Sequence, residues 1–202
     1  MKRSYGWLTI ALSVLCGCGG AAHQEAVGFG RILVQGRAEY AAGNAAEKDL
    51  VAAARSWAEG IITKGGGRGD QLGQNAKIAG DLAKSADQIS SQLGQLRKAV
   101  YDQTLQKEFT QGVRSTLITQ ITKRQRTLQE LRTALTDSAA QFQELSETRA
   151  YKGDSYPTAV DKLNRMVQGY RTPPDLVAEA LGSLKSEYGI KDMELVTHAA
   201  AR

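Results

Sequence analysis

The chain is poor in the residues that cross-link, kink or catalyse. Its 202 residues include two cysteines, three prolines and two histidines, and aromatic residues make up 6%. Both cysteines, Cys16 and Cys18, lie near the start, so packing rather than disulfides must stabilise the rest. The scarcity of proline favours long uninterrupted helices, as does the abundance of Ala, Gln, Leu, Lys, Arg and Glu.

Residues for catalysis or metal binding are not grouped in the sequence. His23 and His198 stand near opposite ends of the chain. The acids are spread at helical surface spacing, with no Glu-x-x-His or His-Glu-x-x-His motif. We therefore expect no enzymatic activity, no catalytic residue, no metal ion and no cofactor apart from covalent lipid.

The charge balance is mildly basic. Lys and Arg number 26 against 21 acids, a formal net charge of +5. Removal of Lys2 and Arg3 with a signal segment lowers it to +3 (24 minus 21). So small an excess gives no reason to expect a nucleic-acid partner.

The N-terminal segment, residues 1–17, has the pattern of a secretory signal peptide. Lys2 and Arg3 are followed by an apolar run from Trp7 to Leu15. That run is too short to span a bilayer as a mature helix. We expect the whole segment to be removed.

The end of this run, Leu15-Cys16-Gly17-Cys18, resembles the lipobox of bacterial lipoproteins. The resemblance implies cleavage between Gly17 and Cys18, with a diacylglycerol and an N-acyl chain such as palmitate on Cys18. Cys16 departs from the usual Ala, Ser or Thr and leaves open its use as the lipidated residue. Gly19, in place of Asp, implies the outer membrane, with the protein facing the periplasm. Two or three acyl chains anchor a protein stably where one is marginal.

The part of the chain from Cys18 to Arg202 has a length that suits one domain. We expect a lipidated tether over residues 18–23, a helical-bundle domain over 24–196 and a disordered tail over 197–202.

Three long amphipathic helices are predicted from apolar positions seven residues apart. The first runs from about residue 24 to 63. The second and third share a heptad register that fails between them, where Gln103, Lys107, Thr110 and Arg114 occupy the seam. The rows are Leu33, Tyr40, Ala54 and Ile61; Leu72, Ala79, Ala86, Leu93 and Val100; and Ile121, Leu128, Leu135 and Phe142.

Two architectures are compatible with this register. A break near residues 101–109 would make an elongated antiparallel three-helix bundle or coiled coil that buries its own seams. An unbroken helix over 71–150 would need to oligomerise to cover its apolar row. We favour the bundle, an all-α fold, because three comparable seams bury one another without a partner chain.

Shorter elements separate and follow these helices. The glycine-rich stretch 65–70 predicts a turn, which we prefer to an integrin-type Arg68-Gly69-Asp70 motif or an anion-binding loop. Two short C-terminal helices are expected, one starting near Ser155 and Pro157, the other capped by Thr172 and ended by Gly189.

Four basic residues on the third helix, Lys123, Arg124, Arg126 and Arg132, form a candidate patch for anionic lipid or an acidic partner. The simpler interpretation is a solvated face paired with acids such as Glu130. Arg124 lies on the seam, and we expect its guanidinium to reach the edge of the bundle.

These features predict a membrane-anchored lipoprotein with a non-enzymatic structural or accessory role in the cell envelope. Its partners would be the membrane and either an envelope protein or a second copy of the chain. Two alternatives stay open: a membrane-active protein whose amphipathic helices form pores or bind lipid, and a periplasmic carrier with a ligand cavity between helices.

Overall fold

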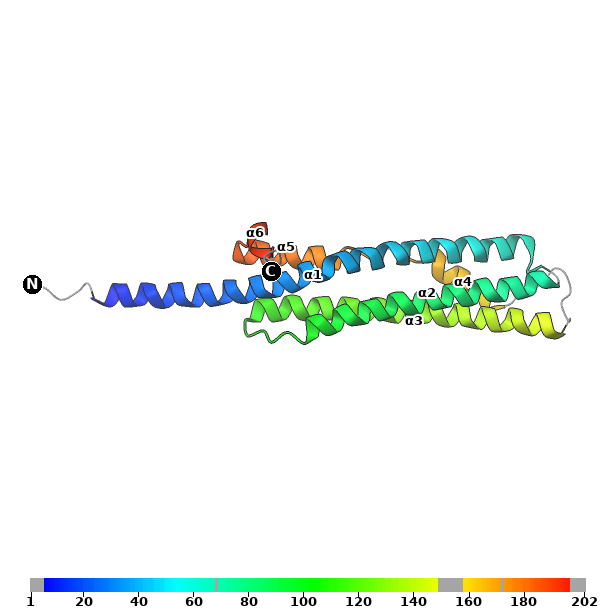
Figure 1. The fold of residues 1–202 in the computed structure, drawn as a ribbon, viewed down its shortest axis with the longest axis horizontal. Coiled ribbons are helices and arrows are strands. Elements are labelled where there is room, and N and C mark those ends of the chain that lie inside the picture. Colours follow the sequence, from blue (N-terminus) through cyan, green and yellow to red (C-terminus); the bar gives the residue numbers. More distant parts are fainter. Residues whose placement is uncertain (1–5, 68, 149–157, 172, 197–202) are drawn as a thin grey trace, which may run out of the picture. The chain divides into compact units, whose positions relative to one another are not determined.

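The computed structural model describes residues 6–67, 69–148, 158–171 and 173–196. Three long helices and three short ones follow one another, and the described residues contain no strand (Figure 1). The long helices are α1 (Gly6–Lys64), α2 (Asp70–Tyr101) and α3 (Glu108–Thr148). The short ones are α4 (Thr158–Gln168), α5 (Leu176–Tyr188) and α6 (Asp192–Leu195). The predicted all-α fold is confirmed.

The chain divides into two compact units. Unit 1 contains residues 1–38, 97–120 and 175–202, and unit 2 contains residues 39–96 and 121–174. Each of the three long helices contributes residues to both units. The units are described separately below.

Unit 2 is a three-helix bundle in which α2 runs antiparallel to α1 and α3. The Gln125 side chain of α3 bonds the Ser90 carbonyl of α2, while Arg132 pairs with Asp87, so residue numbers rise along one helix as they fall along the other. Trp57 of α1 bonds Asn75 of α2 and packs edge-on against Phe142 of α3 at 5.8 Å between ring centroids. These contacts place Trp57, Asn75 and Phe142 at the same level along the bundle.

The heptad rows predicted from the sequence form the core of unit 2. Leu128, Leu135 and Phe142 are fully buried, as are Ala79 and Ala86 on α2. Alternation of alanine with larger side chains lets the helix backbones approach closely while leucine and phenylalanine fill the space between them. The predicted break is also confirmed: residues 102–107 form a turn between α2 and α3, so the single long helix over 71–150 is wrong.

Helix α4 adds a short layer to unit 2. The Arg55 side chain of α1 donates to the Val167 carbonyl at 2.6 Å, near the end of α4. The Gln141 side chain of α3 accepts from the backbone N–H of Ala159 at 3.2 Å. Val160, Leu163 and Val167 are buried on the inner face of α4. The helix therefore packs on α1 and α3.

Unit 1 contains the N-terminal part of α1, the α2–α3 turn, α5 and α6 (Figure 1). Asp175 caps α5 by accepting from the N–H of Ala178 at 3.0 Å. The predicted cap, Thr172, is therefore corrected to Asp175, because the helix begins only after the two prolines. Gly189 ends α5 with a left-handed φ of 64°, as predicted, because glycine adopts this conformation without steric cost.

The remaining predictions concern chain ends and connections. The expected tether, residues 18–23, is helical and belongs to α1, and His23 is held by contacts to distant parts of the chain. The predicted helix start near Ser155 and Pro157, the residues Arg68 and Thr172, and the tail over 197–202 lie outside the described residues.

Candidate functional site

The predicted lipid-attachment residue lies on the N-terminal part of α1. Gly17 and Cys18 are helical, and their side chains are not among those described. Along the described part of α1, the first buried core residues of unit 1 are Ala26, Val27 and Phe29. The packed part of unit 1 thus begins about 12 Å of helix beyond Cys18.

The four residues of the predicted basic patch have different surroundings. Lys123 is exposed, and Arg126 pairs with Glu130 at 3.2 Å, as the simpler interpretation expected. Arg132 pairs with Asp87 at 3.4 Å. Arg124 is only 6% exposed, so the expectation that it reaches the edge of the bundle is wrong. It turns inward because a buried carboxylate is present to receive it.

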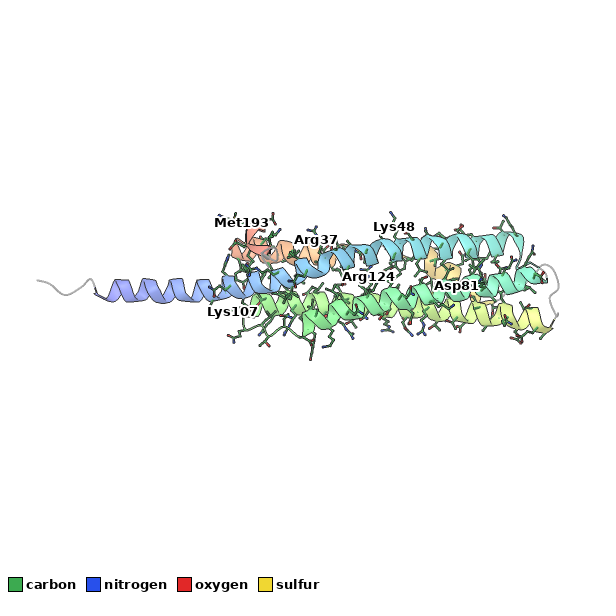
Figure 2. The ribbon with its side chains drawn as sticks, in the orientation of Figure 1. Arg37, Lys48, Asp81, Lys107, Arg124 and Met193 are labelled. Carbon is green, nitrogen blue, oxygen red and sulfur yellow. The ribbon has the colours of Figure 1, made fainter. Side chains whose placement is uncertain are left out.

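That carboxylate is Glu47, which is 1% exposed in the core of unit 2. Arg124 donates its Nε proton to Glu47 Oε2 at 2.5 Å, and Nη2 approaches the same oxygen. The Arg124 guanidinium also lies over the ring of Tyr40, 5.2 Å from the ring centroid. The pair therefore links α1 to α3 inside the bundle, where Figure 2 labels Arg124.

The ion pair is not fully satisfied by hydrogen bonds. Among the described residues, Glu47 Oε1 and Arg124 Nη1 are buried without a hydrogen-bond partner. Burial raises the pKa of the Glu47 carboxyl, and the hydrogen bond and charge of Arg124 oppose that shift. A buried pair of this kind aligns helices more than it stabilises them, because desolvating both charges offsets much of their attraction.

A second polar cluster lies in unit 1 and joins α1 to the C-terminal helices. His23 Nδ1 is 2.9 Å from the Tyr188 carbonyl oxygen, and Nε2 is 2.7 Å from Glu194 Oε1. Both neighbours are acceptors, so the ring needs a proton on each nitrogen and is cationic in this arrangement. The hydrogen bonds to Glu194 and to the Tyr188 carbonyl raise the pKa of His23.

Glu194 also organises α6. Its carboxylate accepts the backbone N–H of Lys191 at 2.7 Å, while its own carbonyl accepts from Arg31 Nε at 2.9 Å. The Lys191 N–H and then His23 hold the pKa of Glu194 below its usual value. The next residue, Leu195, packs on Gly30, where an added Cβ would come within 2.7 Å of Leu195 Cδ2. A larger residue at position 30 would therefore displace the end of the Leu195 side chain.

Glu25 holds the α2–α3 turn in the same unit. Its carboxylate accepts the backbone N–H groups of Gln106 at 2.8 Å and Lys107 at 3.0 Å, and the hydroxyl of Thr110. Burial raises the pKa of Glu25, but these hydrogen bonds outweigh it, so the pKa lies below its usual value. A carboxylate here also complements the positive end of the α3 dipole. Glu25 thus caps a helix that is distant from it in the sequence.

Unit 2 also has an open groove between α1 and α2, with a volume of about 430 Å³. Its apolar residues include Leu50, Leu82 and Ile89, and polar groups such as Asp49 and Gln92 line the rest. The described residues contain no cluster of histidine, cysteine or acidic side chains able to hold a metal ion. Within the same residues, no helix has the length and apolar character needed to cross a membrane.

Sequence reasoning missed His23, Glu25, Glu47 and Glu194 as structural contacts. Only Glu47 had a signal: it falls on the heptad row between Tyr40 and Ala54, as Arg124 does on the row through Leu117 and Leu131. Two opposite charges on facing seams predict a buried pair. The other three make contacts between distant parts of the sequence, for which no local pattern exists.

Comparison of the chain with protein-family models, with curated proteins and with solved structures finds no match. The functional conclusion therefore depends on the residues and geometry of this chain alone.

Proposed function

We propose that the chain is a lipoprotein of the bacterial cell envelope, anchored through Cys18 to the outer membrane and facing the periplasm, with a non-enzymatic structural or accessory role. The observation that carries the proposal is Leu15-Cys16-Gly17-Cys18 at the end of a short apolar run with a basic start. Diacylglycerol and an N-acyl chain on Cys18 would hold the protein at the bilayer.

A protein-binding role is supported by the helical faces of the chain. The long helices bury their heptad rows within the chain, and their outer faces carry charged and amide side chains such as Lys48, Gln88 and Gln129. Polar side chains of this kind suit the hydrogen-bonded rim of a protein interface. The role therefore consists of holding an envelope partner, or a second copy, close to the membrane.

Lipid attachment is tested by comparing two single substitutions, Cys18→Ala and Cys16→Ala, in the native host. We expect Cys18→Ala to accumulate unprocessed precursor and to lose the acylated mature form. Cys16→Ala, the matched control, should be processed and should fractionate with the outer membrane. Normal processing of Cys18→Ala would contradict the proposal.

The partner role is tested by photo-crosslinking in cells. A crosslinking residue is placed at Ala53 in the groove of unit 2 and, in a second strain, at Lys123 on the exposed face of α3. We expect a defined envelope protein, or a covalent dimer, from at least one position, abolished by competition with an unlabelled chain. Absence of any specific product from both positions would contradict a binding role.

A further inference from the structure

Apolar side chains are left exposed at the end of unit 1 from which α1 continues toward its N-terminus. Met193 in α6 is 75% exposed, Val196 just after it is 59% exposed, and Phe109 at the start of α3 is 37% exposed. Leu105 in the α2–α3 turn is half-buried. Figure 2 labels Met193 and Lys107 at this same end. We call Leu105, Phe109, Met193 and Val196 the end surface.

The end surface is tied to the first described turns of α1. His23 holds Glu194, the residue after Met193, and Glu25 holds the backbone of Gln106 and Lys107. The ring of Phe109 packs edge-on against Tyr188 at 5.7 Å, so the start of α3 and the end of α5 also meet here. His23 and Glu25 therefore mark the near edge of this surface along α1. Arg31, which bonds the Glu194 carbonyl, and Gly30, on which Leu195 packs, lie further along the helix.

That near edge is close to the proposed lipid-attachment residue. Cys18 precedes His23 by five positions and Glu25 by seven on the same helix. At about 1.5 Å per residue these separations are about 8 Å and 11 Å, and Gly30, beside Leu195, lies about 18 Å from Cys18. The headgroup region of one leaflet is itself about 5–8 Å thick. Continuous helix joins Cys18 to His23 and Glu25, because α1 runs from Gly6 to Lys64.

We propose that the end surface rests on the phospholipid bilayer, with Met193 among the headgroups beside the acyl chains of Cys18 and Val196 at their outer edge. This inference rests on the proposed lipidation of Cys18. The acyl chains supply retention at the membrane, and the apolar side chains fix the orientation of unit 1 on it. Methionine and valine here would leave water for the interface on docking.

The charges near the end surface indicate the kind of bilayer. Lys107 and Lys191 adjoin it, and so do the acids Glu108 and Asp192. Charges of both signs therefore adjoin the end surface, as do Glu25, Glu194 and His23, and no cluster of cations among the described residues there calls for anionic lipid. A zwitterionic phosphatidylcholine vesicle is therefore a sufficient probe.

The test uses a single thiol in the acylated full-length mature protein. Acylation blocks the Cys18 thiol and Cys16 leaves with the signal, so Met193→Cys carries the only reactive cysteine. Labelled with an environment-sensitive fluorophore and reconstituted in phosphatidylcholine vesicles, it should show a blue shift and strong quenching by nitroxide-bearing lipid. Val34→Cys is the matched control, about 24 Å beyond Cys18 on α1. Its fluorescence should be unaffected by the same lipid.

A second substitution separates insertion from mere proximity. Val196→Asp in the labelled chain should reduce the quenching at position 193 severalfold, while Val34→Asp should leave it unchanged. Equal quenching at positions 193 and 34, or quenching insensitive to Val196→Asp, would overturn the inference. The intact mass of the same sample separates the two proposals: acylated protein without quenching contradicts membrane docking alone, and an unmodified Cys18 contradicts lipidation and docking together.

Discussion

The two units of this protein hold their helices together in different ways. Unit 2 uses a repeated apolar seam with one buried ion pair, Glu47 with Arg124, in its interior. Unit 1 uses partly exposed polar contacts made by His23 and Glu25 on α1 with α5, α6 and the α2–α3 turn. Unit 1 also buries apolar residues such as Phe29 and Leu184, and its carboxylates and histidine add specific contacts where the heptad register fails.

The largest effect is expected from breaking the buried pair in unit 2. Arg124→Met leaves Glu47 buried without its partner and should lower the free energy of unfolding by about 3–5 kcal/mol. Adding Glu47→Leu should recover most of that loss, because two well-packed apolar residues remove both desolvation costs. Urea unfolding is followed by the fluorescence of Trp57, the only tryptophan besides Trp7.

The control for this comparison is Lys123→Met on the exposed neighbouring position, which should change the free energy of unfolding by less than about 0.5 kcal/mol. A double variant as unstable as Arg124→Met alone would show that the pair is not acting as a coupled unit.

A smaller effect is expected from removing the cap of α3 in unit 1. Glu25→Ala leaves the N–H groups of Gln106 and Lys107 without their carboxylate and should cost about 1 kcal/mol. Amide exchange over residues 106–110 should accelerate, while Glu39→Ala, an exposed acid on the same helix, should leave it unchanged. Because the pKa of Glu25 is lowered from 4.5, its contribution is complete above that value and is lost as pH falls through the folded value.

The contact between His23 and α6 should make unit 1 sensitive to pH. The folded pKa of His23 is raised above 6.5, so its stabilising contribution is fully present below pH 6.5 and is lost as pH rises through the folded value. Glu194 has a pKa lowered from 4.5, so its contribution is present above pH 4.5 and is lost as pH falls through the folded value. Docking of α6 should be tightest between pH 4.5 and 6.5.

Amide exchange over residues 190–196, corrected for the intrinsic pH dependence of exchange, measures this docking. In the native chain, the protection of these amides from exchange should fall as pH rises through the folded pKa of His23. In His23→Ala, protection should no longer change over that pH range. His198→Ala is the matched control, since it removes the only other histidine. An alkaline loss that persists in His23→Ala would assign the effect to another group.

The smallest effect is expected at the surface pair of α3. Arg126 and Glu130 are solvent-exposed partners one helical turn apart. Arg126→Ala should change the free energy of unfolding by about 0.3–0.5 kcal/mol, and less at high salt. A loss above about 1 kcal/mol in the same urea titration would show that the exposed face of unit 2 contributes more than its geometry indicates.

The sequence predicts the helices that carry a repeated apolar pattern. It does not predict the contacts between residues that are distant in the sequence. The sevenfold rows through Leu33, Leu72 and Ile121 place all three long helices, and the failure of the register near Gln103 locates the turn. The inward direction of Arg124 follows from the sequence only when Glu47, on the facing row of α1, is considered as its partner. Contacts such as His23 with Glu194 depend on folding that brings distant residues together, so no local spacing encodes them.

The central claim is that Cys18 is the lipidated first residue of the mature protein. The most direct test is mass spectrometry of the N-terminal peptide released from protein purified from the membrane of its host. We predict a peptide that begins at Cys18 and carries a diacylglycerol and an N-acyl chain. A peptide that begins elsewhere, or an unmodified Cys18, would contradict the account.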